Sequence, residues 1–553
     1  MFESEFALYS WLRLSVFTVS CCATSSLAAQ DIPNSFESVR EQPVRGQADR
    51  QLDPAIAPVV QSDIGDTAGD ASGVTIGAVS VNSRSQIPPE LLAAGYEQFI
   101  GQNADQKTLQ ELASAVSEAA RSGGYVFASA QILPQAIKLG VVSVSLDPGA
   151  IDEVRIIGSQ NKRLRKVLDK LRCEAARSDI VERQLLLAGD LPGITLNGSS
   201  YLQENGKGIL VVTVSEDRSS GYASLDNHGP NTLGPIRARL RLDIAGLLSD
   251  SDAVTTSVIS SIAEPKELTY VSLRYTNVLG DGDTSVGFSA SAGRTRSGSS
   301  LRALGLEGRN RYASVFASHA LKRSNDLNLW LNAELAYLQS EQTLSNSLFQ
   351  QDEIVTASLN FAGNYNVGTG RIYGGIGVTQ GLGILGANSA ADPLSSRPNS
   401  SGQFTKAHFW INSILNLGQG FSTRLAATGQ IASKPLLAPH EIAVGGPNFG
   451  RGFDYSERFG DEGILGLAEI RKDFNKVANW LNWLQVYGFV DGGYVSNIGT
   501  GFGDGSLLST GGGFRAQIGK FDLGVEAAAP VNEDRFESDD RSSQINVQMG
   551  IQF

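Results

Sequence analysis

The sequence SSQINVQMGIQF at Ser542–Phe553 has the side-chain pattern of a β-strand. In it Ile545, Val547, Met549 and Ile551 alternate with Asn, Gln or Gly, and Phe553 continues the apolar series. Period-two alternation places apolar side chains on one face of a β-strand and polar ones on the other. A strand between lipid and a water-filled pore needs this pattern, and the half-buried strand of a soluble sandwich gives it too. The stretch predicts a β architecture and leaves both classes open.

The same alternation recurs upstream. Over residues 236–244, apolar residues at even positions alternate with Arg237, Arg239, Arg241 and Asp243. Three arginines on one face would be costly in the core of a soluble sheet but suit a water-filled lumen. Sixteen strands are predicted to start near residues 221, 236, 253, 268, 285, 307, 327, 353, 371, 404, 421, 463, 484, 508, 521 and 543. We therefore favour a membrane β-barrel of about 16 antiparallel strands, spanning residues 219–553, over a sandwich.

Connection lengths give a second test. If the first strand runs outward, long external loops should alternate with short periplasmic turns. Short connections at 323–326, 418–420 and 519–520 fall in the predicted periplasmic set. The long connections 381–403, 434–462 and 496–506 are candidates for the external set. On these boundaries the alternation of lengths does not hold everywhere.

Composition narrows the class further. The chain has 553 residues, of which 41% are hydrophobic, only 18% are charged and 61 are glycine. Beyond residue 29 it contains no apolar run of the roughly 18 residues that a spanning helix needs. The net charge of −12 argues against a nucleic-acid partner bound through a general basic field.

The beginning of the chain has the pattern of an export signal. An apolar core at Leu14–Ala23 is followed by small residues up to Ala29, which predicts a signal peptide at 1–29. Residues 30–73, rich in Pro, Gln, Asp and Gly, are expected to be a linker with room for one short plug helix around 36–41. Cys21 and Cys22 leave with the signal, and Cys173 is expected to be a small buried hydrophobe without a catalytic role.

Residues 74–150 and 151–218 are predicted to form two small α+β units. In the first, a capping box at Thr108–Glu111 is expected to begin a helix that Gly123–Gly124 ends. Strands are expected at 74–81, 125–133 and 141–146. In the second unit, strands are expected at 153–157, 194–196 and 209–214, and helices at 164–171 and 179–188.

Motifs of enzymes and metal sites are weak in this chain. Gly381–Gly386 matches a dinucleotide-binding glycine pattern but precedes no helix that could hold a pyrophosphate. His440-Glu441 begins a zinc-protease motif, but Val444 stands where the second His is required. We expect no enzymatic activity, no cofactor and no metal.

The most informative stretch is VGGPNFGRGF at 444–453, inside the long connection after the eleventh strand. Glycines on both sides of Arg451 allow its backbone unusual angles and a close approach to a wall. If the loop folds into the lumen, the arginine needs a partner. Alternation over 484–494 places Asp491 on the lumen face with Phe489, which makes Asp491 that partner.

At these residues the chain resembles a known superfamily. Gly450-Arg451-Gly452-Phe453 and Phe489-Val-Asp491-Gly-Gly493 resemble the two signature motifs of outer-membrane assembly factors and two-partner secretion transporters, with Gly450 in place of the usual Val. A strand that ends on Phe553 resembles the final strand of bacterial outer-membrane proteins. Upstream, the passages around Gly124-Tyr125 and Leu133-Pro134-Gln135, and Glu182-Arg183 through Asp190-Leu-Pro-Gly193, resemble the two POTRA domains of two-partner secretion (TpsB) transporters. Asp226–Gly229 fits the same family.

The resemblance implies a function. The POTRA units would receive an unfolded exoprotein in the periplasm of a Gram-negative bacterium, and the barrel would carry it across the outer membrane. Implied partners are this exoprotein, outer-membrane lipid and, through Phe553, the barrel assembly machinery. The alternative function is that of a general outer-membrane β-barrel assembly factor, which normally has more POTRA domains. A passive porin or adhesin barrel is a third alternative, but it would give the two α+β units no function.

Two sets of candidate site residues follow. The first is the loop motif and its partner strand, expected to hold the inserted loop, to stabilise the fold, or both: Gly450, Arg451, Gly452, Phe453, Phe489, Asp491 and Gly493. The second is a set of lumen charges that can solvate an unfolded chain: Arg237, Arg239, Arg241, Glu469 and Arg471. The three arginines are expected to be solvated rather than to form a specific site for the exoprotein.

Overall fold

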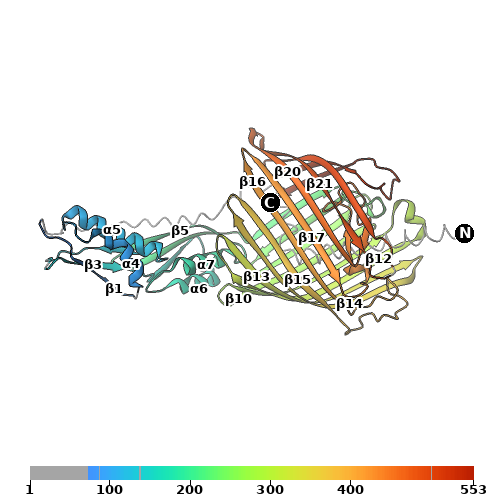
Figure 1. Ribbon diagram of the computed structural model, residues 1–553. Helices are drawn as coiled ribbons and strands as arrows, with labels where there is room; N and C mark the ends of the chain where they lie inside the picture. The colour runs from blue at the N-terminus through green and yellow to red at the C-terminus, as the bar shows by residue number, and fades with distance from the viewer. Residues whose placement is uncertain (1–72, 86, 136, 138, 500) are drawn as a thin grey trace.

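A computed structural model describes residues 73–553 except 86, 136, 138 and 500. The predicted signal peptide and plug helix, and nearly all of the predicted linker, lie outside the described residues. In the described part, two small α+β units follow one another and lead into one end of a barrel (Figure 1).

Sixteen strands of the described residues form a closed antiparallel barrel, as predicted. Its strands are β7 (Ser219–Asp226), β8 (Arg237–Ala245), β9 (Asp252–Ser261), β10 (Leu268–Leu279), β11 (Thr284–Arg296), β12 (Leu306–Lys322), β13 (Leu327–Leu344), β14 (Ser347–Val367), β15 (Gly370–Leu382), β16 (Thr405–Gly418), β17 (Phe421–Ala432), β20 (Glu462–Ala478), β21 (Leu481–Ser496), β22 (Gly505–Ile518), β23 (Phe521–Pro530) and β24 (Gln544–Gln552). Fifteen predicted starts lie within three residues of the observed ones. The prediction for β14 was six residues late, because the polar run Gln350–Asp352 hides a strand that stays in register with β13.

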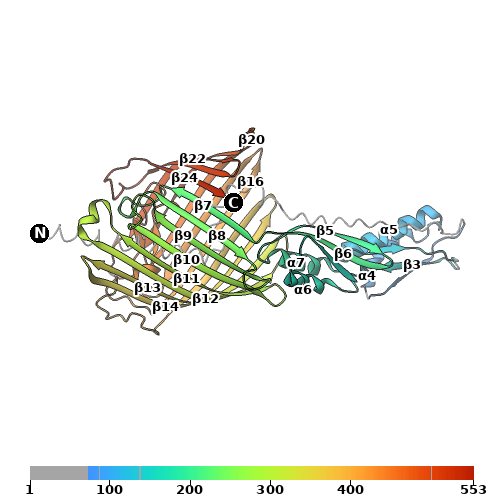
Figure 2. The ribbon, with the colours of Figure 1, turned by 180° about the vertical axis from the view of Figure 1, so that it is seen from behind.

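The barrel closes between β24 and β7, which lie side by side in Figure 2. Their ladder runs from Gln548↔Asp226 to Gln552↔Tyr222, only five residue pairs. Phe553 and Gly221 extend it with two backbone hydrogen bonds of 2.7 and 3.0 Å. The ring of Phe553 covers Gly221 so closely that a Cβ there would lie 2.3 Å from it.

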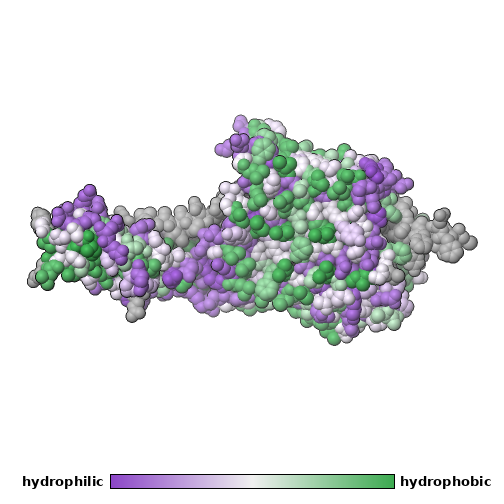
Figure 3. Space-filling model, viewed as in Figure 1, coloured by the Kyte–Doolittle hydropathy of each residue, from purple (hydrophilic) through white to green (hydrophobic). Residues whose placement is uncertain are grey.

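The barrel wall has two chemical faces. On β21, Val486 and Val490 are exposed on the outside, whereas Tyr487 and Asp491 are buried on the inside. Figure 3 shows hydrophobic residues over the wall and hydrophilic ones gathered toward both ends. This is the face pattern of a barrel whose outside meets lipid. None of the described helices is long and apolar enough to cross a membrane.

Most long connections of the described barrel lie at one end, but the alternation of long and short does not hold everywhere, as the sequence indicated. Connections of two to six residues, such as 323–326, 419–420 and 519–520, lie at the end that carries the α+β units. The long connections 383–404, 433–461 and 497–504 lie at the opposite end. The alternation fails at 345–346, an external turn of two residues that is as short as the turns at the other end.

The first unit is a three-stranded sheet with helices on one face. It contains β1 (Ala78–Ser83), α4 (Pro89–Tyr96), η1 (Glu97–Phe99), α5 (Gln106–Ser122), β2 (Ser129–Gln131) and β3 (Val141–Asp147), with strand order β1-β3-β2. The capping-box prediction was wrong: Asp105 caps α5 by accepting the Thr108 N–H at 2.8 Å, so the helix begins earlier. The strand predicted at 125–133 shrinks to three residues, and α4, begun by Pro89, was not predicted.

The second unit repeats this design with strand order β4-β6-β5. It contains β4 (Glu153–Ile157), α6 (Lys162–Leu168), η2 (Asp169–Leu171), α7 (Ser178–Gly189), β5 (Ile194–Glu204) and β6 (Lys207–Glu216). Cys173 follows η2 in a bridge with Ile151 and is exposed, so the expectation of a small buried hydrophobe was wrong. The helical pattern that suggested burial ends two residues before it.

The second unit docks on the turns at its end of the barrel. Glu182 of α7 accepts the Asn325 N–H at 2.7 Å, and Arg183 donates to the Ala320 carbonyl at 3.1 Å. Asp190 pairs with Arg323 at 2.6 Å. The apolar core of the unit continues onto Val278, Ala320 and Trp330 of the barrel. The Glu-Arg passage of the sequence therefore lies at the junction between unit and barrel.

Candidate functional site

One long connection folds back into the barrel. Between β17 and β20 it contains η5 (Ala438–His440), β18 (Ile442–Val444) and β19 (Arg458–Gly460). β18 and β19 pair as a short hairpin, which we call the stem, and residues 445–457 form the tip. We call residues 433–461 the inserted loop.

Glycines allow the tip to press against the wall. Gly450 has φ +82°, a conformation that favours glycine. At Gly452 a Cβ would lie 2.5 Å from the backbone of Ala529 on β23, which is too close for any side chain. The close approach expected from the glycines around Arg451 is therefore seen at Gly452.

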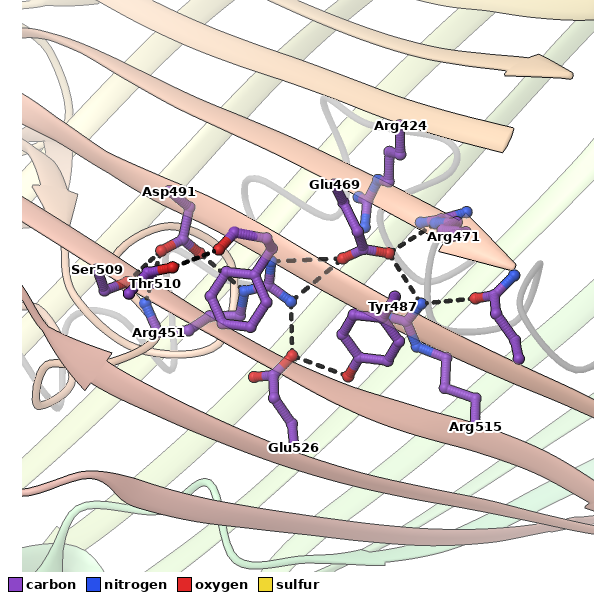
Figure 4. Close-up of polar contacts among 12 residues, drawn as sticks. Arg424, Arg451, Glu469, Arg471, Tyr487, Asp491, Ser509, Thr510, Arg515 and Glu526 are labelled. Carbon is purple, nitrogen blue, oxygen red and sulfur yellow. Dashed lines mark hydrogen bonds and ion pairs between the residues drawn. The ribbon is translucent and has the colours of Figure 1, made fainter. Parts of the chain in front are cut away.

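Arg451 lies at the centre of a buried ionic network, which we call the lumenal centre (Figure 4). Its Nε lies 2.8 Å from Oδ2 of Asp491, and its Nη1 lies 2.6 Å from Oε2 of Glu526 and 3.3 Å from Oε2 of Glu469. The Arg451 backbone N–H also donates to Asp491 at 3.2 Å. The Arg451 side chain is 5% exposed, and those of Asp491 and Glu469 are fully buried. A single guanidinium thus joins the loop to three barrel strands.

An aromatic face completes the seat of the arginine. The Arg451 Cζ lies 3.3 Å from the centroid of the Phe489 ring, a cation–π contact. Opposite Phe489 on β22 stands Gly511, where a Cβ would lie 2.6 Å from that ring. The missing side chain leaves room for Phe489 to lie along the wall beneath the arginine.

The network continues toward the end that carries the α+β units. Glu469 accepts from Arg471 at 2.6 Å and from Arg515 at 2.9 Å. The Tyr487 hydroxyl donates to Glu526 at 2.9 Å. Glu469 is therefore shared by three arginines, which explains how a carboxylate can be fully buried inside the barrel.

The other predicted residues fall into two places. Phe453 is buried in an apolar cluster with Val444, Leu465, Val495 and Leu507, and Gly493 abuts Leu465 with no room for a Cβ. Arg237 and Arg241 lie away from the lumenal centre, paired with Asp226 at 2.8 Å and with Asp243 at 2.9 Å, and Arg239 lies between them on β8. Of the predicted lumen charges, Glu469 contacts Arg451 directly, and Arg471 contacts Glu469.

Sequence reasoning missed Glu526 and Arg515. Both lie on strands whose alternation gives their face, since Glu526 alternates with Val525 and Ala527 in β23. Alternation does not give the height of a residue along the barrel axis, so it could not bring Glu526 to Arg451.

The exit of the tip is fastened to the neighbouring connection between β23 and β24. Asp454 accepts from Arg535 at 2.6 Å, from the Glu537 N–H at 2.9 Å and from Gln544 at 3.0 Å. Burial raises the pKa of Glu457, in the tip and outside the strands, to about 7, although it accepts the Asp454 N–H. Ionic contacts therefore hold the tip at Arg451 and again at Asp454, three residues further along the chain.

This arrangement holds the inserted loop against the barrel wall through ion pairs. The described residues contain no group of three or more His, Cys, Asp or Glu side chains placed to hold a metal ion. A cavity of about 210 Å³ borders Arg451, Asp454, His228 and Arg535, so the tip has space beside it.

A family model and curated relatives match this chain. The model described as haemolysin secretion/activation protein ShlB/FhaC/HecB matches residues 206–516, and the ShlB-type POTRA domain model matches residues 74–149. The heme/hemopexin transporter protein HuxB of Haemophilus influenzae is 22% identical over 405 residues, covering 70% of each chain.

Solved structures share the fold. CdiB from Escherichia coli aligns with a TM-score of 0.72 at 16% identity, covering 94% of this chain and 99% of that one. CdiB from Acinetobacter baumannii aligns with a TM-score of 0.66 at 16% identity, covering 97% and 99%.

Proposed function

The chain belongs to the haemolysin secretion/activation protein family of two-partner secretion transporters, and from this membership we propose how its parts divide the work. As a member it is an outer-membrane transporter that carries a secreted exoprotein to the cell surface, with its POTRA region in the periplasm. The end of the barrel that carries the α+β units is thus the periplasmic end, and the long connections are external.

The two α+β units would receive the unfolded exoprotein. Each unit has a sheet of three strands in which two are outer strands, β1 and β2 in the first and β4 and β5 in the second. An extended segment can add to such a strand through main-chain hydrogen bonds, which need little sequence specificity. Docking of the second unit on the barrel turns would keep this entry surface at a fixed place beside the pore.

The lumenal centre would be the lock of the inserted loop. The observation that carries this role is the contact of Arg451 with Asp491, Glu469 and Glu526, which belong to three different strands. Losing one partner of a buried ion pair leaves the other charge uncompensated, so the tip has one strongly preferred seat. Gly450, Gly452, Phe453, Phe489 and Gly493 would shape that seat, while Arg237, Arg239 and Arg241 would line the lumen for an unfolded chain.

Three further roles belong to this proposal. The apolar outer face of the barrel would contact outer-membrane lipid. The last strand, with Phe553, would be recognised by the barrel assembly machinery. Transport would proceed by binding and passage, without covalent chemistry.

Comparative proteomics of a deletion strain tests the function, with culture supernatant and outer membrane measured together. We expect one large secreted protein to disappear while the other outer-membrane barrels keep their abundance. A general fall of many barrels would instead identify an assembly factor and overturn the proposal. Complementation with the wild-type gene is the control, and it should restore the same secreted protein.

A further inference from the structure

A second buried ionic cluster lies at the outer mouth of the barrel. Its centre is Arg397, in the connection between β15 and β16, with a side chain only 1% exposed. Its Nη1 lies 3.1 Å from Oε1 of Glu441 and 2.6 Å from Oδ1 of Asp461, and both carboxylates are buried. Charges in external loops are normally solvated, because burying them is costly unless they are paired. We call this cluster the mouth cluster.

The two carboxylates stand at the two roots of the stem. Glu441 immediately precedes β18, and Asp461 immediately follows β19. Asp461 also accepts the Leu436 N–H at 2.6 Å and the Ile498 N–H at 2.7 Å. One carboxylate therefore joins both ends of the inserted loop to the connection between β21 and β22, and Arg397 joins them to a third connection.

Apolar packing holds the same region. Leu436 and Leu437 are fully buried against Tyr312, Leu338, Ile354 and Phe404. Gln430 of β17 donates to the carbonyl oxygens of His440 at 2.9 Å and of Asp461 at 3.0 Å. The root of the inserted loop is thus built as a part of the barrel rim.

The tip begins differently. Gly445 and Gly446 have φ of +115° and +91°, which L side chains rarely adopt. Consecutive glycines can absorb a large backbone rotation at little cost, as hinge positions do. A fixed root, a pair of glycines and a tip held by one ionic seat form the parts of a hinged arm.

We propose that Arg397 is a positioning residue for transport, which latches the stem of the inserted loop to the outer rim. The tip then leaves and re-enters the lumen as an arm hinged at Gly445–Gly446, and the stem returns Arg451 to Asp491 in register. This inference rests on the proposed role of the lumenal centre. Without the latch the root keeps its apolar packing and its main-chain hydrogen bonds but leaves Glu441 and Asp461 buried without their cation, so the stem shifts and the Arg451 guanidinium no longer meets its carboxylates at bonding distance.

Labelling from outside the cell tests the position of the tip. The reporter is Ser456→Cys, at a buried position of the tip, in a background with the other three cysteines replaced by serine. Intact cells are treated with a membrane-impermeant maleimide, and export of the exoprotein is measured in the same cultures. The test variant is Arg397→Gln, and the matched control is Arg541→Gln, which removes an exposed external pair with Asp534.

We expect Arg397→Gln to raise the labelling rate at least tenfold and to lower export about tenfold, at equal barrel abundance, while Arg541→Gln changes neither. If Arg397→Gln does not reach the outer membrane, the labelling rate and export are measured in Arg397→Lys instead. Lysine keeps a buried cation but lacks the planar guanidinium that can contact two carboxylates at once. Unchanged labelling, or raised labelling with full export, would overturn the role of Arg397. Normal export from Arg451→Ala would instead overturn the proposed role of the lumenal centre as the lock of the inserted loop. The failure of one proposal can therefore be distinguished from the failure of the other.

Discussion

The ion pairs of the lumenal centre and those of the junction between the second unit and the barrel differ in their exposure to water. In the lumenal centre the Arg451 side chain is 5% exposed and its partners Asp491 and Glu469 are fully buried. At the periplasmic junction, Lys170 and Asp281 form a pair that is 49% and 46% exposed. The same chemistry therefore operates in two environments, with water largely excluded from one and present in the other.

The difference decides what each group can do. An exposed pair contributes about 0–1 kcal/mol and is weakened by salt, because water and ions compete for both charges. Breaking a buried pair costs about 3–5 kcal/mol, since the remaining charge has no solvent. The weak pairs of the junction can orient the second unit. The buried pairs of the lumenal centre can hold the inserted loop in one position until other groups replace the contacts of Arg451.

The largest effect is expected for Arg451→Ala. The change leaves Asp491 and Glu526 without the cation that joins them. The equilibrium constant that favours the seated tip over the unseated one should therefore fall by a factor of about 100 or more. We expect export to fall at least tenfold at equal barrel abundance, measured as exoprotein in the supernatant. Arg451→Lys is the matched control and should be intermediate, because an ammonium lacks the planar fork. Normal release from Arg451→Ala would remove this residue from the site.

A smaller effect should separate the two acidic partners. Asp491 accepts from both the backbone and the side chain of Arg451 and is fully buried, whereas Glu526 is 12% exposed. We expect export to fall about tenfold in Asp491→Asn and about threefold in Glu526→Gln, following the greater burial of the first pair. The reverse order in the same secretion assay would mean that Glu526 is the main seat of the arginine.

Acidity should act on the tip. Burial raises the pKa of Glu457 to about 7, so its protonated form is favoured in the seated tip. The stabilisation is fully present below the ordinary carboxyl pKa and is lost as pH rises through about 7. From pH 6 to pH 8 we expect hydrogen exchange of the tip amides, corrected for intrinsic rates, to rise by up to about tenfold. Glu457→Gln should flatten this dependence, and an equally steep profile in that variant would contradict the assignment.

The smallest effect is expected at the junction. Asp190→Asn removes a pair in which Arg323 is 10% exposed and Asp190 is 41% exposed, so one partner remains open to water. Because such a pair contributes about 0–1 kcal/mol, hydrogen exchange of the α7 amides should rise less than about fivefold. High salt should have a similar effect on the wild-type protein and little effect on the tip. A tenfold or larger rise that salt does not reproduce would show that this junction behaves like the buried centre.

Much of the fold could be predicted because apolar and polar residues alternate along the sequence of a barrel strand. One face meets lipid and the other water, so Val486 and Tyr487 already differ in kind along the sequence. The prediction was late at β14, where the strand rises beyond the apolar zone and polar residues interrupt the pattern.

The candidate site could be predicted only in part. Arg451 and Asp491 were found because a glycine-flanked arginine and a lumen-facing carboxylate stand out locally. Glu526 lies 75 residues from Arg451 and reaches it only through the stagger of the closed sheet. Arg397 lies in an external connection without periodicity, and no local pattern connects it to Asp461, 64 residues away.

The five-pair ladder between β24 and β7 also sets an order of assembly. Its partners lie more than 300 residues apart, so a long chain segment must be arranged before they meet. Until then the unfinished sheet has two open sides with free N–H and C=O groups, which attract further strands and which hydrocarbon does not tolerate. Barrel closure is therefore a late step of folding. Until it occurs, both edge strands of the open sheet need a transient partner that pairs with or covers them.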